Sequence, residues 1–485
     1  MHIKNLSPLP ALAAGLGLIL AAQATAQTFT TLHSFTNGTD GSDPKAGLIL
    51  SSNTLYGTAL GGDSRSGTVF AVNTDGTGFT TLDSFTDGTD GAVPKAGLIL
   101  SGNTLYGTAE SGNIGARYGT VFAVNTDGSG FSTLHVFTYG DGAGPAAGLT
   151  LSGNALYGTT LGGGSSGWGT VFEVNADFTG FATLYSFTAP NGANGPNGDG
   201  AMPKAGLILS SNTLYGTASG GGSSGRGTVF SINVDGTGFT NLHNFSATTN
   251  NAGLTGANSD GSGPAAGLAL SSNTLYGTAF GGGTFGNGTV FSVNTDGTGF
   301  TTLHSFTAAP SGTNSDGSGP AAGLVLSGNI LYGTASGGGS SGNGTVFVLN
   351  TDGTGFTTLH TFTATINGTG LTGTNSDGSG PVAGLVLSGN TLYGTASGGG
   401  SSGNGTVFSL SLPPIGGPQV TISISGANVV LTWPTNAAGF ILQSTTNLVS
   451  PPVWTTNSPA PVVVNGQNTV TNLILGAQQF YRLSQ

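Results

Sequence analysis

The sequence predicts an all-β protein: a seven-bladed β-propeller closed by its N-terminal strand, followed by a small β-sandwich. Three observations carry this prediction. A unit of four short apolar runs occurs seven times along 485 residues, and the fourth run is offset by one unit relative to the other three. A Pro/Gly-rich segment then separates these repeats from a tail with a different pattern.

The first 26 residues are typical of a secretory signal peptide. His2 and Lys4 precede an apolar run from about Ala11 to Ala22, and Ala24-Thr25-Ala26 has the small residues of a cleavage site. We expect the mature chain to begin at Gln27. The alternative, a membrane anchor, is disfavoured because this apolar run is short for a span, and no later segment is long and apolar enough.

Residues 27–412 hold the repeats. The words "AGLxLS", "LYGT", "GTVF" and "FTTLHSF" each occur seven times, and successive "LYGT" tyrosines are 50 to 61 residues apart. The runs are rich in Val, Leu, Tyr, Phe and Thr and are bounded by Gly or Asx turns, so each unit predicts four β-strands. The Asp-Gly of "NTDGTG" tolerates the positive φ of a short hairpin between the third and fourth strands.

The offset of the fourth strand predicts how the repeats close. The first "FTTLHSF", residues 29–35, precedes the first "AGL", and the seventh unit has no fourth strand of its own. If residues 29–35 pair beside residues 405–411, no free sheet edge remains between the first and last units. An open solenoid would instead have atypical capping repeats at its ends. We therefore expect a closed ring, with the variable loops of 10 to 20 residues connecting its blades.

The tail begins after residues 413–418, "PPIGGP", which we expect to be a linker. Residues 419–485 contain alternating runs such as "VTISIS" and "VVLTW", with Trp433, Trp454, Phe480 and Tyr481 as a candidate core. Short strands separated by frequent turns predict a compact β-sandwich.

Composition excludes several classes of function. Only eight Lys and Arg are present against 19 Asp and Glu, for a net charge of -11, so a basic face for nucleic acid is not available. The chain has no cysteine, which excludes thiol catalysis and cysteine metal sites. The glycine-rich loops open strands and not helices, so they do not match a phosphate cradle.

Most acidic residues and histidines recur once per repeat. Thirteen Asp occupy turns, seven of them between blades, and His33, His135, His243, His304 and His360 share one place in the fourth strand, where Asp83 and Tyr185 replace them. Residues spaced around a ring do not form one catalytic site, so we predict structural roles and no catalytic residues. The pairs Asp40/Asp43 and Asp87/Asp90 leave a calcium site open as an alternative, although turns explain them as well.

The candidate binding residues are those that break the repeat. Between the second and third strands, units six and seven have only Ser, Gly and Asn, whereas the first five carry larger side chains. We expect this loop to share one face of the ring with the loops between blades. Aromatic side chains beside a few polar groups can stack on sugars or anchor a protein. The alternative is local packing. The candidate residues are Trp168, Tyr118, Phe280, Phe285, Arg65, Arg117, Arg226 and Glu110.

The repeat "AGLxLSGNTLYGTASGGGSSGNGTVFxVNTDGTGFTTLHSF" resembles the GloVer tandem repeat of the "choice-of-anchor" group of secreted bacterial proteins, over residues 29–412. This resemblance implies an extracellular or envelope protein and transfers no catalytic residues. The strand order also resembles quinoprotein propellers, but their tryptophan docking motif is absent, so we infer no quinone or other cofactor. The tail, "LTWP…FILQSTTNL…W…FYRL", resembles fibronectin-type-III-like terminal modules, which implies a spacer, attachment or export role.

Three hypotheses about function remain. The first is a secreted binding propeller whose partner is an extracellular glycan or protein. The second is a polysaccharide lyase or hydrolase, which would need two facing carboxylates, while the only glutamates, Glu110 and Glu173, fall in different units. The third is a structural or adhesive surface protein without a small ligand.

Overall fold

The computed structural model describes residues 27–63, 66–112, 118–192, 195–249, 255–368, 373–412, 420–426, 428–434, 441–446, 454–456, 459–464, 467–473 and 479–484. The predicted signal peptide (1–26) and linker (413–418) lie outside these residues. The chain divides into two compact units, Thr28–Ser411 and a second unit that contains the C-terminal strands. Each unit is described by itself.

The first unit consists of seven antiparallel sheets of four strands each, which confirms four strands per repeat. Within six of the sheets, each strand pairs with the next along the chain. The first strands are β2 (Ile49–Ser51), β6 (Ile99–Ser101), β10 (Thr150–Ser152), β14 (Ile208–Ser210), β18 (Ala269–Ser271), β22 (Val325–Ser327) and β26 (Val386–Ser388). The second strands are β3 (Thr54–Ala59), β7 (Thr104–Ala109), β11 (Ala155–Thr160), β15 (Thr213–Ala218), β19 (Thr274–Ala279), β23 (Ile330–Ala335) and β27 (Thr391–Ala396).

The third strands are β4 (Thr68–Asn73), β8 (Thr120–Asn125), β12 (Thr170–Asn175), β16 (Thr228–Asn233), β20 (Thr289–Asn294), β24 (Thr345–Asn350) and β28 (Thr406–Ser411). The fourth strands are β5 (Thr80–Ser84), β9 (Ser132–Val136), β13 (Phe181–Ser186), β17 (Thr240–Asn244), β21 (Thr301–Ser305), β25 (Thr357–Thr361) and β1 (Phe29–Ser34). We number the sheets from the first (β2–β5) to the seventh (β26, β27, β28 and β1). A 3₁₀ turn, Pro310–Gly312, follows the fifth sheet.

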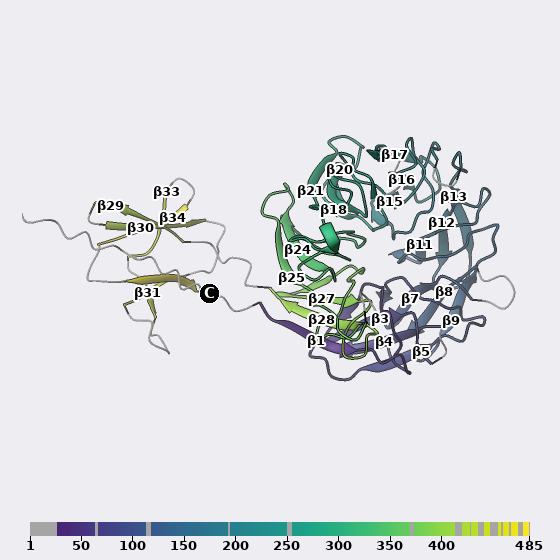
Figure 1. Cartoon of the computed structure of the whole chain (residues 1–485), viewed down its shortest axis with the longest axis horizontal. Coiled ribbons are helices and arrows are strands. Elements are labelled where there is room, and N and C mark those ends of the chain that lie inside the picture. Colours follow the sequence, from purple (N-terminus) through teal and green to yellow (C-terminus); the bar gives the residue numbers. More distant parts are fainter. Residues whose placement is uncertain are drawn as a thin grey trace, which may run out of the picture. The chain divides into compact units, whose positions relative to one another are not determined.

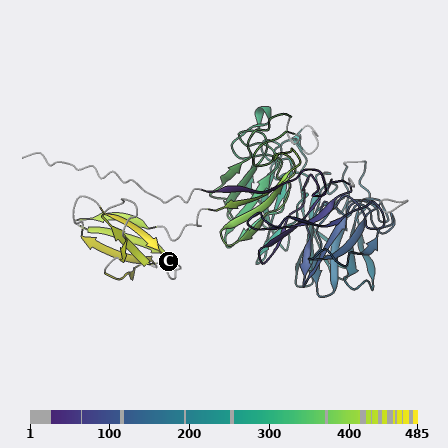
Figure 2. The same cartoon turned by 90° about the horizontal axis from the view of Figure 1, so that it is seen from below.

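The seventh sheet combines the two ends of this unit. Strand β1 pairs antiparallel with β28, from Phe29 opposite Leu410 to Ser34 opposite Thr406. The predicted pairing of residues 29–35 with residues 405–411 is therefore confirmed. In Figure 1 the sheets follow one another in chain order around a common centre, and purple β1 lies beside green β28. Figure 2, turned by 90°, shows the same two strands side by side.

The first strands are shorter than the six-residue "AGLxLS" word predicts, because its first three residues do not join the ladder. Instead, the glycine of each "AGL" approaches the equivalent glycine of the preceding sheet. A Cβ added to Gly97 would meet the carbonyl oxygen of Gly47 at 3.1 Å, and one added to Gly47 would meet that of Gly384 at 3.3 Å. Backbone contact at this point leaves little room for a side chain, so glycine is required there.

Hydrogen bonds connect each sheet to the next in the same way. The "LYGT" threonine of one sheet donates to the carbonyl of the "AGL" alanine of the following sheet, as from Thr58 Oγ1 to Ala96 O at 3.2 Å. Thr395 Oγ1 of the seventh sheet donates to Ala46 O of the first at 3.0 Å. The contact between the last and first sheets is thus equivalent to the contacts between consecutive sheets.

The core of this unit lies between neighbouring sheets. The phenylalanine of every "GTVF" is fully buried. Phe230, for example, packs in one cluster with Tyr157 and Phe187 of the third sheet and Leu214 of its own. Burial of a large aromatic ring at every such boundary supplies the hydrophobic stabilisation that a cysteine-free chain needs.

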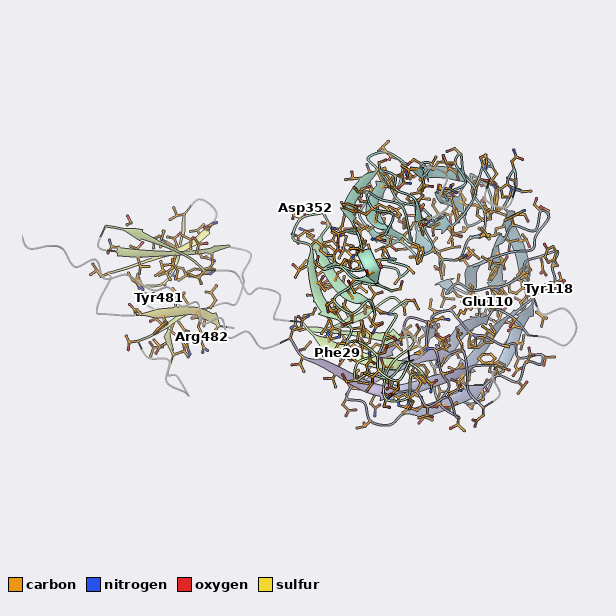
Figure 3. The ribbon with its side chains drawn as sticks, in the orientation of Figure 1. Phe29, Glu110, Tyr118, Asp352, Tyr481 and Arg482 are labelled. Carbon is orange, nitrogen blue, oxygen red and sulfur yellow. The ribbon has the colours of Figure 1, made fainter. Side chains whose placement is uncertain are left out.

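The second unit has two antiparallel sheets. Their strands are β29 (Thr421–Ser425), β30 (Asn428–Pro434), β34 (Gln467–Leu473) and β33 (Val462–Val464) in one sheet, and β32 (Thr455–Thr456), β31 (Ile441–Thr445) and β35 (Phe480–Ser484) in the other. Trp433 packs with Leu442 and Tyr481 in a core that draws on both sheets. Trp454 instead lies under the guanidinium of Arg482, 4.4 Å from its ring centroid, and Figure 3 shows Tyr481 and Arg482 next to each other on β35.

Candidate functional site

Two sets of connections lie together on one side of the first unit, which we call the loop face. The glycine loops join second to third strands (60–67, 110–119, 161–169, 219–227, 280–288, 336–344 and 397–405). The junction loops lead from each fourth strand to the next sheet (35–48, 85–98, 137–149, 187–207, 245–268, 306–324 and 362–385). Single β-bridges join the two sets, as between Ala92 and Ser111 and between Ala201 and Gly220. The prediction that both kinds of loop share one face is confirmed.

One residue of each glycine loop, just before the "GTVF" glycine, binds the next junction loop through its backbone. Its carbonyl accepts an N–H of that loop, as from Met202 to Trp168 and from Gly263 to Arg226, both at 2.9 Å. We call this residue the seam position. The seven seam residues are Ser66, Tyr118, Trp168, Arg226, Asn287, Asn343 and Asn404. Three predicted binding residues therefore occupy one structural position in three consecutive sheets.

Arg226 is the most deeply buried of the candidates, with 6% of its surface exposed. Its Nε donates to Thr248 Oγ1 of the next junction loop at 3.1 Å. At the same position, Asn287 and Asn343 donate from Nδ2 to the carbonyls of Thr307 and Thr363. A neutral amide therefore makes the same kind of connection that the arginine makes.

The aromatic candidates fall into two groups. Tyr118 packs against Tyr139 of the next junction loop, with ring centroids 5.5 Å apart, and Trp168 packs partly buried against the cluster around Phe187. Phe285 is 53% exposed and Phe280 is 40% exposed. A Cβ added to Gly319 would meet the Phe280 ring at 2.9 Å, so this ring lies over the junction loop that enters the sixth sheet.

Glu110 forms an ion pair with Lys95, which lies in the junction loop that leads into the same sheet. Figure 3 shows Glu110 and Tyr118 on the side of the unit where the second sheet lies. Glu173 lies within β12 of the third sheet, opposite Tyr157 of β11. The two glutamates therefore belong to different sheets. Glu110 lies in a loop, whereas Glu173 lies within a strand. Arg65 and Arg117 lie outside the described residues.

The recurring histidines bind the recurring aspartates of the junction loops. In five sheets the Nε2 of histidine lies 2.9–3.2 Å from an aspartate Oδ2, as in His243 to Asp260. Tyr185 Oη donates to Asp199 at 2.8 Å in the third sheet. Each of these six rings also stacks on a phenylalanine of the following sheet, at 3.6–4.1 Å between centroids. They join sheets to each other, as the predicted structural role requires.

The same aspartates accept further bonds from the start of their own junction loop. Ser246 donates to Asp260 from both its backbone N and its Oγ. Burial alone would raise the pKa of the Asp260 carboxyl, but the bonds from His243 and Ser246 outweigh it and hold the pKa below its ordinary value. Burial lowers the pKa of His33 despite its bond to Asp40, which favours the neutral imidazole. His33 and Asp40, whose carboxyl pKa is lowered by the bonds from Thr36 and His33 despite burial, therefore form a neutral donor and a charged acceptor near pH 7.

The first sheet departs from this arrangement, because Asp83 stands where the others have His or Tyr. Val69 is opposite Asp83 in the ladder, as Val229 is opposite His243. Burial and the charge of Asp90 raise the pKa of Asp83 to about 6. Two carboxyl groups thus face each other at the boundary between the first and second sheets.

The calcium hypothesis rested on two aspartate pairs. Asp40 accepts bonds from Thr36 and Gly38 in addition to His33, and Asp43 forms an ion pair with Lys45 at 2.7 Å. Within the ranges that the structure describes, no three His, Asp or Glu side chains are grouped as a metal ion would need. The turn interpretation accounts for the contacts of Asp40.

The opposite side of the unit, formed by the third-to-fourth-strand turns, has a simpler surface. Its six aspartates each accept bonds from the Thr or Ser two residues later, which lowers the pKa of these exposed carboxyls. They are Asp75, Asp127, Asp177, Asp235, Asp296 and Asp352. Among the described residues of this unit, the basic side chains Lys45, Lys95, Lys204 and Arg226 all belong instead to the loop face.

The repeat identifies the class of protein to which the chain belongs. A family model described as "Gloeobacter/Verrucomicrobia repeat" matches residues 11–198 and 253–431. The chain therefore belongs to the Gloeobacter/Verrucomicrobia repeat family, which confirms the resemblance to the GloVer repeat. A search of curated proteins gives no match.

Several solved structures are similar to the chain at low sequence identity. A nidogen/laminin complex is 14% identical, covers 60% of this chain and 85% of its own, and has a TM-score of 0.35. An oligogalacturonate lyase in complex with manganese is 10% identical, with coverages of 81% and 94% and a TM-score of 0.45. A gluconolactonase from Xanthomonas campestris is 13% identical, with coverages of 81% and 92% and a TM-score of 0.39.

Sequence reasoning missed Tyr139, which is 50% exposed beside Tyr118, and the pairing of Lys95 with Glu110. It also treated the seam residues as free loop positions. Alignment of the seven "GTVF" words with their preceding residue would have shown that Tyr118, Trp168 and Arg226 share one position. No helix within the described ranges has the length and apolar character that crossing a bilayer would need.

Proposed function

We propose that residues 28–411 form a closed seven-bladed β-propeller and that this propeller is a binding module whose partner, an extracellular glycan, is held on the loop face. The closure is supported by the pairing of β1 with β28 and by the bond from Thr395 to Ala46. The pairing of β1 with β28 is equivalent to the pairing of third and fourth strands within the other six sheets, and a bond equivalent to that from Thr395 to Ala46 occurs at every other boundary between sheets.

One observation carries the binding role: the loop face combines exposed aromatic rings with the described basic side chains of the ring. Tyr139, Phe280 and Phe285 are exposed there. Aromatic faces stack on the apolar faces of sugars, so these exposed rings offer stacking contacts to a glycan. On the opposite face, the recurring side chains are the aspartates of turns, and one exposed ring, Phe178, lies in such a turn of the third sheet.

A catalytic role is less well supported by the geometry. Glycoside chemistry uses two carboxylates that face one another across a bond. Glu110 is bound to Lys95, and Glu173 lies in a strand of another sheet. The low-identity enzyme structures do not bear on this question. We prefer the binding role because the two glutamates do not face one another.

We also propose that the protein is secreted or attached to the cell envelope, as a repeat protein of the choice-of-anchor group, and that the second unit is a fibronectin-type-III-like module. The signal-like first 26 residues and the Pro/Gly segment before this unit support the proposal. Fractionation of cells expressing the full chain, compared with one that ends at residue 412, tests where each form accumulates.

The binding proposal is tested by glycan-array binding of residues 27–412, with the wild type compared with a variant that lacks the two exposed rings of the fifth sheet, Phe280→Ala/Phe285→Ala. We expect the wild type to bind polysaccharide and the variant to lose about tenfold or more in affinity, because each stacking contact between an aromatic ring and a sugar contributes about 1 kcal/mol. A variant on the opposite face, Asp352→Asn, is the matched control and should bind normally. Absence of wild-type binding to every glycan and cell-wall preparation would contradict the proposal.

A further inference from the structure

Arg226 has a positive charge that no acidic side chain of the protein compensates. All 19 Asp and Glu residues fall within the described ranges. Within those ranges, Lys45 pairs with Asp43 and Lys95 pairs with Glu110. The Arg226 side chain instead donates from Nε to the hydroxyl of Thr248. Arg226 is 6% exposed, and burial of a cation without an acidic partner costs folding free energy.

The architecture does not require this charge. Asn287 and Asn343 fill the same seam position in the fifth and sixth sheets, and their amides satisfy the start of the next junction loop. The backbone bond of the seam position, from Gly263 N to Arg226 O, involves no side chain. The guanidinium is therefore an addition to a seam that an uncharged residue already completes elsewhere in the same ring.

We propose that Arg226 is a carboxylate-binding residue of the loop face, and that the glycan held there is acidic, with uronic-acid carboxylates along its chain. This inference rests on the proposed glycan-binding function and names the class of its ligand. With Nε bound to Thr248, the two terminal nitrogens remain, and an end-on guanidinium pairs with a planar carboxylate through two parallel bonds.

The carboxylates of the two adjoining junction loops are engaged, Asp199 by Tyr185 and Thr188, and Asp260 by His243 and Ser246. They therefore have donors of their own and do not serve the arginine.

Aromatic side chains flank this position along the loop face. Trp168 holds the seam position of the preceding sheet, and Phe280 and Phe285 lie in the glycine loop of the following one. A linear polymer lying along consecutive glycine loops would meet an indole, a guanidinium and then exposed phenyl rings. Alternation of stacking and charge pairing suits an acidic polysaccharide, whose residues each offer an apolar face and a carboxylate.

The test compares oligogalacturonate with the fully methyl-esterified oligomer of the same length, by calorimetric titration of the full chain. We expect the wild type to bind the free acid more tightly, with an affinity that falls as salt is added. Arg226→Asn, which installs the residue of three sibling sheets, should weaken binding of the acid about tenfold and leave binding of the ester unchanged. Arg482→Gln, in the other unit, removes the same charge and should change neither.

The outcomes separate this inference from the function on which it rests. Equal wild-type affinities for acid and ester, or an Arg226→Asn variant with unchanged preference, would overturn the carboxylate assignment and leave glycan binding intact. Failure of the wild type to bind either oligomer or any other glycan would overturn both. Should Arg226→Asn melt below the wild type, Arg226→Lys decides: it keeps the charge without the fork, and undiminished preference for the acid would exclude bidentate pairing.

Discussion

At the scale of single residues, the boundary between consecutive sheets is held by a recurring trio. A His or Tyr binds an aspartate of the junction loop and stacks on a phenylalanine of the next sheet, as His304 does with Asp316 and Phe356. Asp83 breaks this pattern, since it has neither a donor at ordinary pH nor a ring. The first boundary should therefore be the weakest of the seven and the most sensitive to pH.

This sensitivity has a definite sign. The pKa of Asp83 is raised in the folded protein to about 6, from 3.8 in an ordinary environment. The folded state thus holds this proton more tightly than the unfolded state, so the contribution of Asp83 to stability is present below about pH 4 and is lost as pH rises through 6. We expect Asp83→His to raise the melting temperature at pH 8, where a neutral imidazole donates to Asp90, and to raise it less at pH 4.5.

Calorimetric melting of both forms across this pH range measures the difference. Thr81→Ala controls for disturbance of β5. Thr81 lies two residues from Asp83 on the same strand, and its hydroxyl donates to the carbonyl of Thr39. The effect of this variant should therefore not vary with pH. A gain from Asp83→His that is constant between pH 4.5 and 8 would show that the pKa of Asp83 is not raised into this range in the folded protein.

At the scale of elements, the glycine of each "LYGT" strand is required by the phenylalanine of its partner strand. Gly216 is opposite Phe230 in the ladder, and a Cβ at Gly216 would approach Phe230 Cζ to 2.6 Å and Leu207 Cδ2 to 2.7 Å. The ring fills the space that a side chain would otherwise take, so a strand interior tolerates glycine here for a packing reason.

We therefore expect Gly216→Ala to lower the free energy of unfolding by about 1–3 kcal/mol, because the Cβ overpacks a fully buried ring. Gly198→Ala is the matched control, since nothing lies within 4 Å of a Cβ added there. Chemical denaturation of both variants provides the measurement. Equal stabilities would mean that the core beside Phe230 relaxes freely, against the packing described here.

The sequence predicted elements better than contacts. Apolar runs, turn residues and the offset "FTTLHSF" word define the strands and the partner of β1, because these depend on local pattern and on repetition. The depth of Arg226, the ion pair of Lys95 and the three-residue length of the first strands depend on which neighbouring sheet lies above a given side chain. The sequence of one repeat unit does not contain that information, because these features are set by contacts between neighbouring sheets.

At the scale of the whole first unit, every boundary repeats the same three connections: a threonine bond to an alanine carbonyl, a glycine against a glycine, and a carbonyl at the seam position. The boundary between the seventh and first sheets has all three, through Thr395, Gly47 and Asn404. The closure that we propose would add stability because it leaves no sheet face of the unit without a neighbour.

The most direct test of this account is the melting temperature of the chain after deletion of Phe29–Phe35, measured against the intact mature chain. The deletion removes β1 and the fully buried Phe35, so the seventh sheet loses its fourth strand and the core cluster shared with the first sheet loses Phe35. We predict a fall of roughly 10 °C or more, restored in part by adding a peptide of residues 28–36. A truncated protein that melts as high as the intact one would contradict the closed ring.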